Sequence, residues 1–142
     1  MTKHQPLSAP DHPAEGKRKG LRRKITGGLF LFTGGMHLGI VMANPQYYAS
    51  FAKGAYIPLV EKAWDKIFMA APARWGTAVS LGEATLGILL LRGGGAAKVG
   101  WVGVIAFHFG LMLFSFGIWL WSVPALAFLI PAARADWGSL RR

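Results

Sequence analysis

Three ionisable residues within apolar segments are the positions at which this chain could do chemistry. His37, Glu83 and His108 each stand in a long stretch of hydrophobic residues. Imidazole and carboxyl groups can transfer protons, ligate metals and hold haem. An ionisable group inside a membrane is costly unless it is paired, protonated or hydrated, so we expect these three side chains to have partners.

The expected depths of the three residues favour a common site. Counted from the cytoplasmic edge of each predicted span, His37, Glu83 and His108 lie at about 18, 13 and 15 Å. Four interpretations of such a cluster stay open. It is a hydrogen-bonded knot that fixes helix register, a proton or quinone site, a bis-histidine haem site on His37 and His108, or a non-haem metal site on two histidines and a carboxylate. No catalytic residue is predicted, because no hydrolytic triad pattern is present.

The composition excludes an ordinary soluble enzyme. Of 142 residues, 53% are hydrophobic and 15% are charged, whereas soluble proteins carry about 25% charged residues. The absence of cysteine excludes disulfides, a thiolate nucleophile, and zinc or iron–sulfur sites built on cysteine. The chain is therefore expected to be an all-α integral membrane protein.

We predict a four-helix membrane bundle with spans over residues 25–43, 76–91, 99–116 and 118–133. Asn44-Pro45 ends the first helix, because the residue before a proline is pushed out of the α region. The uncharged stretch 99–133 would make a helix of about 52 Å, too long for one span, so we divide it near Ser115-Phe116-Gly117. The last span holds Pro124 and Pro131, each of which removes a helix hydrogen bond.

Residues 55–70 are predicted to form an amphipathic helix at the membrane surface, because apolar residues recur there at helical spacing between charged ones. Aromatic residues around it fit the interfacial belt of a membrane protein, namely Tyr47, Tyr48, Tyr56, Trp64 and Trp75.

The charge distribution predicts the topology. The net charge is +10, and the segments on one side of four spans hold twelve cations against four in the segment 44–75. By the positive-inside rule both termini are cytoplasmic. We expect a disordered tail over 1–24, a membrane domain over 25–135 and a short cytoplasmic tail over 136–142. The basic run of the first tail is read as an anchor on anionic lipid and not as a nucleic-acid site; its members are Lys17, Arg18, Lys19, Arg22, Arg23 and Lys24.

Glycine spacing adds a packing prediction. Gly35 and Gly39 form a small-xxx-small pair, which lets a neighbouring helix approach closely, and we assign it to packing within the subunit. The glycines of the segment 92–98 are read as a turn between two spans, because the rest of a phosphate-binding motif is missing.

The layout resembles the DoxX-like family of small four-helix bacterial membrane proteins. The resemblance rests on a Gly-Gly-x-His-Leu-Gly segment (34–39), on Asn-Pro-Gln-Tyr-Tyr-Ala-Ser-Phe-Ala (44–52), and on Leu-Gly-Glu-Ala-Thr-Leu-Gly with the aliphatic run after it (81–91). It covers about residues 25–135, and the insert 52–75 is longer than the first loop of the shorter family members. Residue by residue it carries over Glu83 and Gly87, whose place in the second span matches the family pattern.

The resemblance implies a link to membrane redox metabolism. We expect a non-catalytic subunit or scaffold, held in the lipid bilayer and associated with a larger redox or energy-converting membrane complex. The alternative is a protein that handles quinone, protons or haem through His37, Glu83 and His108. Neither interpretation involves nucleic acid.

Overall fold

The computed structural model describes residues 13–138 and residue 140, with side chains from residue 20 onward. This part of the chain is helical and contains no β-strand. Its elements, in order, are α1 (Pro13–Ala43), the 3₁₀-helix η1 (Pro45–Ser50), α2 (Pro58–Ala63), the π-helix η2 (Trp64–Phe68), α3 (Pro72–Arg92), α4 (Gly94–Leu111) and α5 (Phe116–Trp137).

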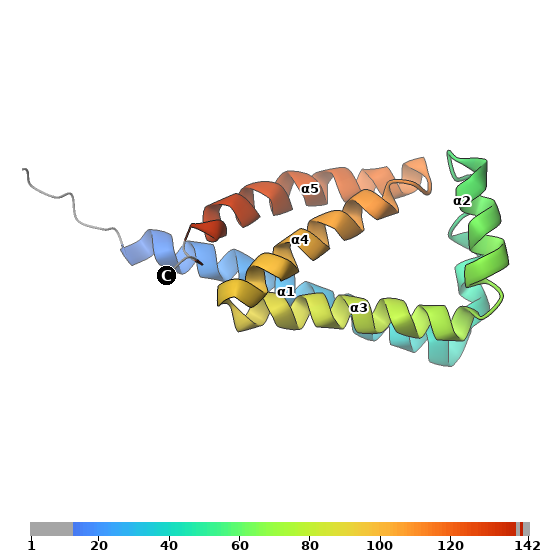
Figure 1. Ribbon diagram of the computed structural model, residues 1–142, viewed down its shortest axis with the longest axis horizontal. Helices are drawn as coiled ribbons and strands as arrows, with labels where there is room; N and C mark the ends of the chain where they lie inside the picture. Colours follow the sequence, from blue (N-terminus) through green and yellow to red (C-terminus); the bar gives the residue numbers. More distant parts are fainter. Residues whose placement is uncertain (1–12, 139, 141–142) are drawn as a thin grey trace, which may run out of the picture.

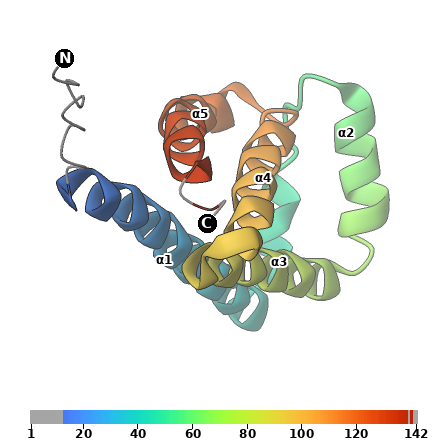
Figure 2. The same ribbon diagram turned by 60° about the vertical axis from the view of Figure 1, so that its left-hand side comes forward.

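The four long helices run back and forth along the molecule (Figure 1). α1 packs along α3, and α5 follows α4 above them, while α2 stands across one end. The two pairs lie close together where α1 begins and diverge toward α2, as Figures 1 and 2 both show. The first helix begins and the last helix ends at the same end of the molecule, opposite α2.

Three of the helices are long and apolar enough to cross a membrane: Gly20–Ala43 of α1, all of α4 and all of α5. Many large hydrophobic side chains are exposed, among them Met42 at 79% and Leu120 at 67%. A soluble monomer rarely exposes that much contiguous apolar surface. These features fit a multi-pass membrane protein. α3 covers the predicted second span with 21 residues, but it is not among the three, because Glu83 and several Ser, Thr and Gly residues lower its hydropathy.

Several predicted boundaries are wrong. The first helix begins at Pro13, so residues 13–24 are helical and not disordered; proline is tolerated in a first turn, where its missing N–H has no helical partner. The remaining part of that predicted tail, residues 1–12, lies outside the described residues. The predicted turn over 92–98 shrinks to Gly93, whose φ of 79° suits glycine, and α4 begins at Gly94.

The break between the last two long helices lies slightly earlier than predicted. α4 ends at Leu111, and extended Ser115 precedes α5, which begins at Phe116. α5 continues through Pro124 and Pro131 to Trp137. The predicted surface helix over 55–70 is found as α2 followed by η2. The predicted end of the first helix at Asn44-Pro45 is confirmed, and the Asn44 side chain accepts a hydrogen bond from the Gln46 N–H at 3.1 Å.

Glycines let α1 and α3 approach closely, although not the predicted pair. A Cβ on Gly34 would lie 2.9 Å from the Ser80 carbonyl oxygen, and one on Gly87 would lie 2.7 Å from the Gly27 carbonyl oxygen. Gly35 and Gly39 have open space where a side chain would stand. Gly87 therefore packs as expected, whereas the prediction for Gly35 and Gly39 within the chain is wrong. The α1 face that packs on α3 contains Gly34, the residue before Gly35, so the predicted pair Gly35 and Gly39 points away from α3.

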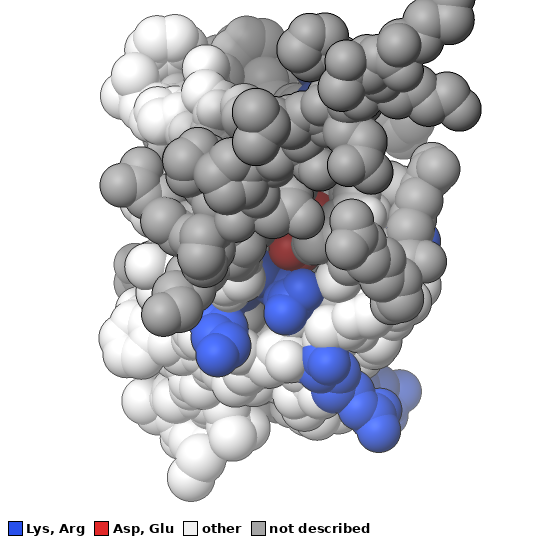
Figure 3. Space-filling model, turned by 90° about the vertical axis from the view of Figure 1, so that its left-hand side faces the viewer, with Lys and Arg blue, Asp and Glu red and all other residues white. Residues whose placement is uncertain are grey.

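A buried polar contact joins three helices at the end opposite α2. The carboxylate of Asp136 on α5 accepts a hydrogen bond from the Trp101 indole of α4 at 2.9 Å and lies 3.4 Å from the Arg23 guanidinium of α1. Asp136 is 1% exposed, so the predicted tail over 136–142 begins inside the packed bundle. Lys and Arg side chains group on this end of the molecule (Figure 3), and they come from the ends of all four long helices.

Candidate functional site

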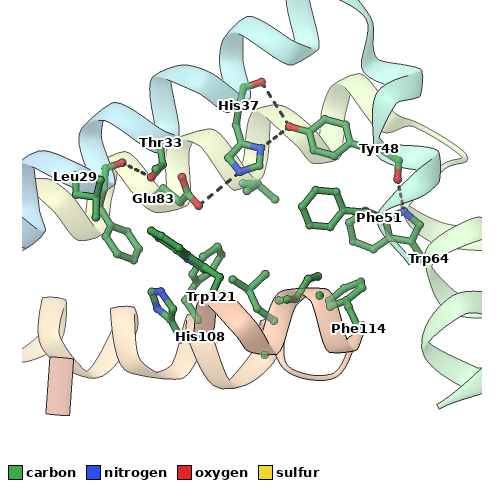
Figure 4. Close-up of a pocket in the computed structure, with 17 residues that line it drawn as sticks. Leu29, Thr33, His37, Tyr48, Phe51, Trp64, Glu83, His108, Phe114 and Trp121 are labelled. Carbon is green, nitrogen blue, oxygen red and sulfur yellow. Dashed lines mark hydrogen bonds and ion pairs between the residues drawn. The ribbon is translucent and has the colours of Figure 1, made fainter. Parts of the chain in front are cut away.

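A cavity of about 620 Å³ lies between the two diverging helix pairs. Figure 4 shows α1 and α3 on one wall, α4 and α5 on the opposite wall, and the segment around Tyr48 and Trp64 at one end. The volume is within the range of small-molecule sites. Most of the lining is apolar or aromatic, and the lining residues are Leu29, Phe30, Thr33, His37, Tyr48, Phe51, Trp64, Val79, Glu83, Phe107, His108, Gly110, Leu111, Phe114, Gly117, Ile118 and Trp121.

Two residues that line the cavity, one on α1 and one on α5, are also exposed on the surface. Leu29 on α1 is 44% exposed and Trp121 on α5 is 59% exposed, and both residues also line the cavity. The contact between Arg23 of α1 and Asp136 of α5 lies farther from α2, at the end of the molecule where α1 begins. Leu29 and Trp121 belong to helices that satisfy the length and hydropathy of a membrane span.

His37 stands between a phenol and a carboxyl group on the cavity wall. Its Nδ1 lies 2.6 Å from the Tyr48 hydroxyl, and its Nε2 lies 3.6 Å from Glu83 Oε1. The Tyr48 ring also stacks on the imidazole, with 9° between the planes. Figure 4 shows the three side chains in a row, from η1 through α1 to α3. Such a row can pass a proton along its length or hold one charge over three groups.

Tyr48 reaches this site because the chain turns sharply after α1. Asn44-Pro45 ends α1, and η1 brings Tyr48 back against the last turns of that helix. Gly76 on α3 leaves room for the phenol ring, since a Cβ there would lie 2.7 Å from Tyr48 Cε2. The Trp64 indole N–H donates to the Tyr48 carbonyl at 2.9 Å. Burial, and then the charge of Glu83, raise the pKa of Tyr48 above its usual value of 10.0.

Sequence reasoning assigned Tyr48 to the aromatic belt and missed its part in the site. It is 1% exposed, whereas its neighbour Tyr47 is 61% exposed and fits the interfacial assignment. One sequence signal could have placed Tyr48 in the site. Asn44-Pro45 ends the helix that carries His37, and a turn at that point brings Tyr48 back toward the last turns of the helix.

Glu83 is buried and its hydrogen-bonding capacity is only partly used. The residue is 4% exposed. Among the described residues, nothing donates a hydrogen bond to its Oε2, and the 3.6 Å between Oε1 and His37 is longer than a hydrogen bond. The neighbouring hydroxyl of Thr33 donates to the Phe30 carbonyl at 3.3 Å. Oε2 of this carboxyl group is therefore an acceptor without a donor from the described residues.

His108 lines the same cavity from the opposite wall (Figure 4). Its Nδ1 lies 2.8 Å from the Val104 carbonyl oxygen. Because a carbonyl only accepts, Nδ1 carries the hydrogen, and the Nε2 of the neutral ring is left as an acceptor. The ring packs between Phe30 and Phe107, which fix its orientation.

Of the three predicted site residues, the structure brings His37 and Glu83 into direct proximity, and it places His108 on the opposite wall of the same cavity. The bis-histidine haem interpretation required His37 and His108 to face one space with no Glu83 between them. Both ring nitrogens of His37 instead face protein groups, so that condition is not met. Among the side chains that the structure describes, from residue 20 onward, no group of three His, Asp or Glu residues is arranged to hold a metal ion.

The basic run of the predicted membrane anchor divides into two parts. Arg22, Arg23 and Lys24 stand on α1 at the end of the molecule opposite α2, and Arg23 turns inward to Asp136. Lys17, Arg18 and Lys19 belong to the same helix, and their side chains lie outside the described part of the chain.

Comparison with protein-family models, with curated proteins and with solved structures finds no match to this chain. The resemblance to the DoxX-like family accordingly stays a prediction.

Proposed function

We propose that this chain is a membrane protein that binds a quinone-class molecule, an apolar ring with oxygen substituents and a hydrocarbon tail, in the cavity between its two helix pairs. The observation that carries the proposal is the cavity itself. It is lined by aromatic and aliphatic side chains, two of which, Leu29 and Trp121, are also exposed on the surface, and its polar groups lie on the walls at His37, Glu83 and His108. Ligand sites commonly combine an apolar lining with a few convergent polar groups.

The proposal includes four membrane spans, with α3 as the second, and both ends on the cytoplasmic side of a bacterial inner membrane. The grouping of cations at the end opposite α2 supports this orientation through the positive-inside rule. Placement of Glu83 against α1 supports α3 as a span, because intramembrane carboxyl groups face the bundle interior and pair with other polar groups.

The test is to measure quinone bound to the purified protein. The chain is expressed in a bacterium, purified in mild detergent and extracted with organic solvent, and quinone is quantified per chain by mass spectrometry. Gly110→Leu adds a side chain at a residue that lines the cavity, whereas Gly28→Leu adds the same side chain at an exposed α1 position outside the lining. We expect about one quinone per chain for the wild type and Gly28→Leu, and a loss of at least tenfold for Gly110→Leu. Equal amounts in all three proteins would refute the proposal.

A second candidate function is the non-catalytic subunit of a larger membrane redox complex. The observation in its favour is an exposed α1 face on which Gly28, Gly35 and Gly39 leave open space, because small residues on a lipid-facing surface allow another helix to approach. Gly35→Leu should then remove a larger complex from a native gel while quinone binding is retained. A complex that survives Gly35→Leu would count against this function.

A further inference from the structure

The polar groups that the cavity offers to a ligand are acceptors of hydrogen bonds. His108 Nε2 is an acceptor because Nδ1 carries the hydrogen. The Glu83 carboxylate is an acceptor with no hydrogen bond to Oε2 from the described residues. The two groups stand on opposite walls of one cavity, Glu83 on α3 and His108 on α4 (Figure 4).

Three hydrogen-bond donors on the same walls are already engaged, and His37 Nε2 faces Glu83 Oε1 at 3.6 Å. The Thr33 hydroxyl donates to the Phe30 carbonyl, and the Trp64 indole donates to the Tyr48 carbonyl. The Tyr48 hydroxyl is engaged with His37 Nδ1 at 2.6 Å. Trp121 supplies a further indole N–H, but this residue is 59% exposed.

From this imbalance we infer that the cavity selects the reduced form of its ligand, a quinol whose two hydroxyl groups donate hydrogen bonds to Glu83 and His108. The inference rests on the proposed function and adds the redox state of the ligand to it. An oxidised quinone has two carbonyl oxygens, which are acceptors, and would face two further acceptors. A quinol has a hydroxyl at each end of its ring, which suits acceptors on opposing walls.

The preference for the quinol follows from the cost of leaving buried acceptors without hydrogen-bond donors. A buried acceptor without a donor has lost its water and gained nothing in return, so a ligand that supplies the donor removes a penalty as well as adding a bond. Sites that hydrogen-bond a hydroxyl reject analogues without it more strongly than apolar pockets reject extra groups. Two such contacts predict a preference of at least about tenfold for the quinol over the quinone.

The experiment measures binding of three related molecules to the full chain in detergent micelles under anaerobic conditions. They are decyl-benzoquinol, its dimethyl ether, and decyl-benzoquinone, followed by quenching of tryptophan fluorescence or by calorimetry. The ether keeps the reduced ring but has no hydroxyl hydrogen. We expect the quinol to bind at least tenfold more tightly than the other two.

Two variants assign the preference to the proposed contacts. His108→Phe keeps a ring in the same place but removes Nε2, and should reduce the ratio of quinol to ether affinity by about fivefold or more while the ether affinity stays. Phe109→Leu is the matched control, because Phe109 is adjacent, 54% exposed and outside the cavity lining. The affinity for the ether reports directly on whether each variant keeps a folded cavity.

The outcomes separate the two proposals. Absence of binding of all three molecules to the wild type would refute the proposed function. Binding that is equal for quinol and ether, tighter for the quinone, or unchanged in ratio by His108→Phe would overturn the redox-state inference and leave the quinone-class site intact.

Discussion

His37 Nε2 lies 3.6 Å from Glu83 Oε1, and this pair joins α1 to α3 on the wall of the cavity. On the same interface, the Ser80 hydroxyl donates to the Gly34 carbonyl at 2.7 Å. Along this interface the two helices are close enough that glycine is needed at Gly34, beside these contacts, and at Gly87, where α3 meets Gly27 of α1. The polar pair therefore depends on a tightly fitted helix interface and, in turn, defines its register.

Replacing His37 by Phe should destabilise the protein by about 1–3 kcal/mol, because the buried Glu83 carboxyl group loses its polar neighbour. Adding Glu83→Gln to His37→Phe should restore most of that loss, since a neutral amide does not need a counter-ion. Unfolding in detergent micelles measures both variants. Losses that simply add in the double variant would show that the pair is not coupled.

Gly34→Ala should destabilise the protein by about 1–3 kcal/mol. The added Cβ would stand 2.9 Å from the Ser80 carbonyl oxygen and 3.1 Å from the Ala84 nitrogen, and backbone atoms cannot move aside easily. Gly35→Ala is the matched control: it has open space and should stabilise α1 by up to about 1 kcal/mol. Thermal unfolding of the two variants side by side checks this, and equal effects would contradict the helix contact described here.

Tyr48→Phe should cost about 0.5–1.5 kcal/mol at neutral pH through loss of the hydrogen bond to His37. The pKa of Tyr48 is raised by burial, and then by the Glu83 charge, so the folded protein keeps a phenol proton that the unfolded chain releases near pH 10. Wild-type stability should therefore fall as the pH rises above 10, whereas the variant lacks this titration.

The difference in free energy of unfolding between wild type and Tyr48→Phe should consequently become smaller above pH 10. Unfolding curves at pH 7 and at a pH above 10 measure this difference. Tyr47→Phe, which alters an exposed neighbouring phenol, should leave stability near the wild-type value at pH 7. A gap that widens with pH would contradict the assigned direction of the shift.

Asp136→Ala should destabilise the protein by about 3–5 kcal/mol, because the Trp101 indole and the Arg23 guanidinium lose a buried acceptor. Asp136→Asn should lower the free energy of unfolding less, since an amide oxygen can still accept the hydrogen bond from the Trp101 indole. Asp65→Ala, at an exposed position of η2, provides the control. Denaturation midpoints of the three variants test the ranking, and similar midpoints for all three would argue against this contact.

The sequence predicts the helical class, most of the helix positions and a common depth for His37, Glu83 and His108, because hydropathy, proline positions and the depth of charged groups are local properties. It does not predict which glycine of a doublet faces a neighbour. Gly34 and Gly35 are adjacent and chemically identical, and only the rotation of α1 against α3 places the first of them inside.

Long-range contacts account for the other differences. Asp136 follows an arginine and an alanine near the end of the chain, which reads as a polar tail. Its burial depends on Trp101 and Arg23, which come from two other helices. The sequence likewise predicts Tyr48 to be an interfacial aromatic residue, because its contact with His37 depends on the path of the chain through η1.

Photo-crosslinking tests the central claim, ligand binding in the cavity, most directly. The chain in proteoliposomes is illuminated with an azido-benzoquinone that carries a decyl chain, and the adducts are mapped by mass spectrometry. We predict adducts in residues 29–37 and 107–121, removed by excess decyl-benzoquinol and by Gly110→Leu. Adducts spread along the lipid-facing helices and insensitive to both treatments would contradict it.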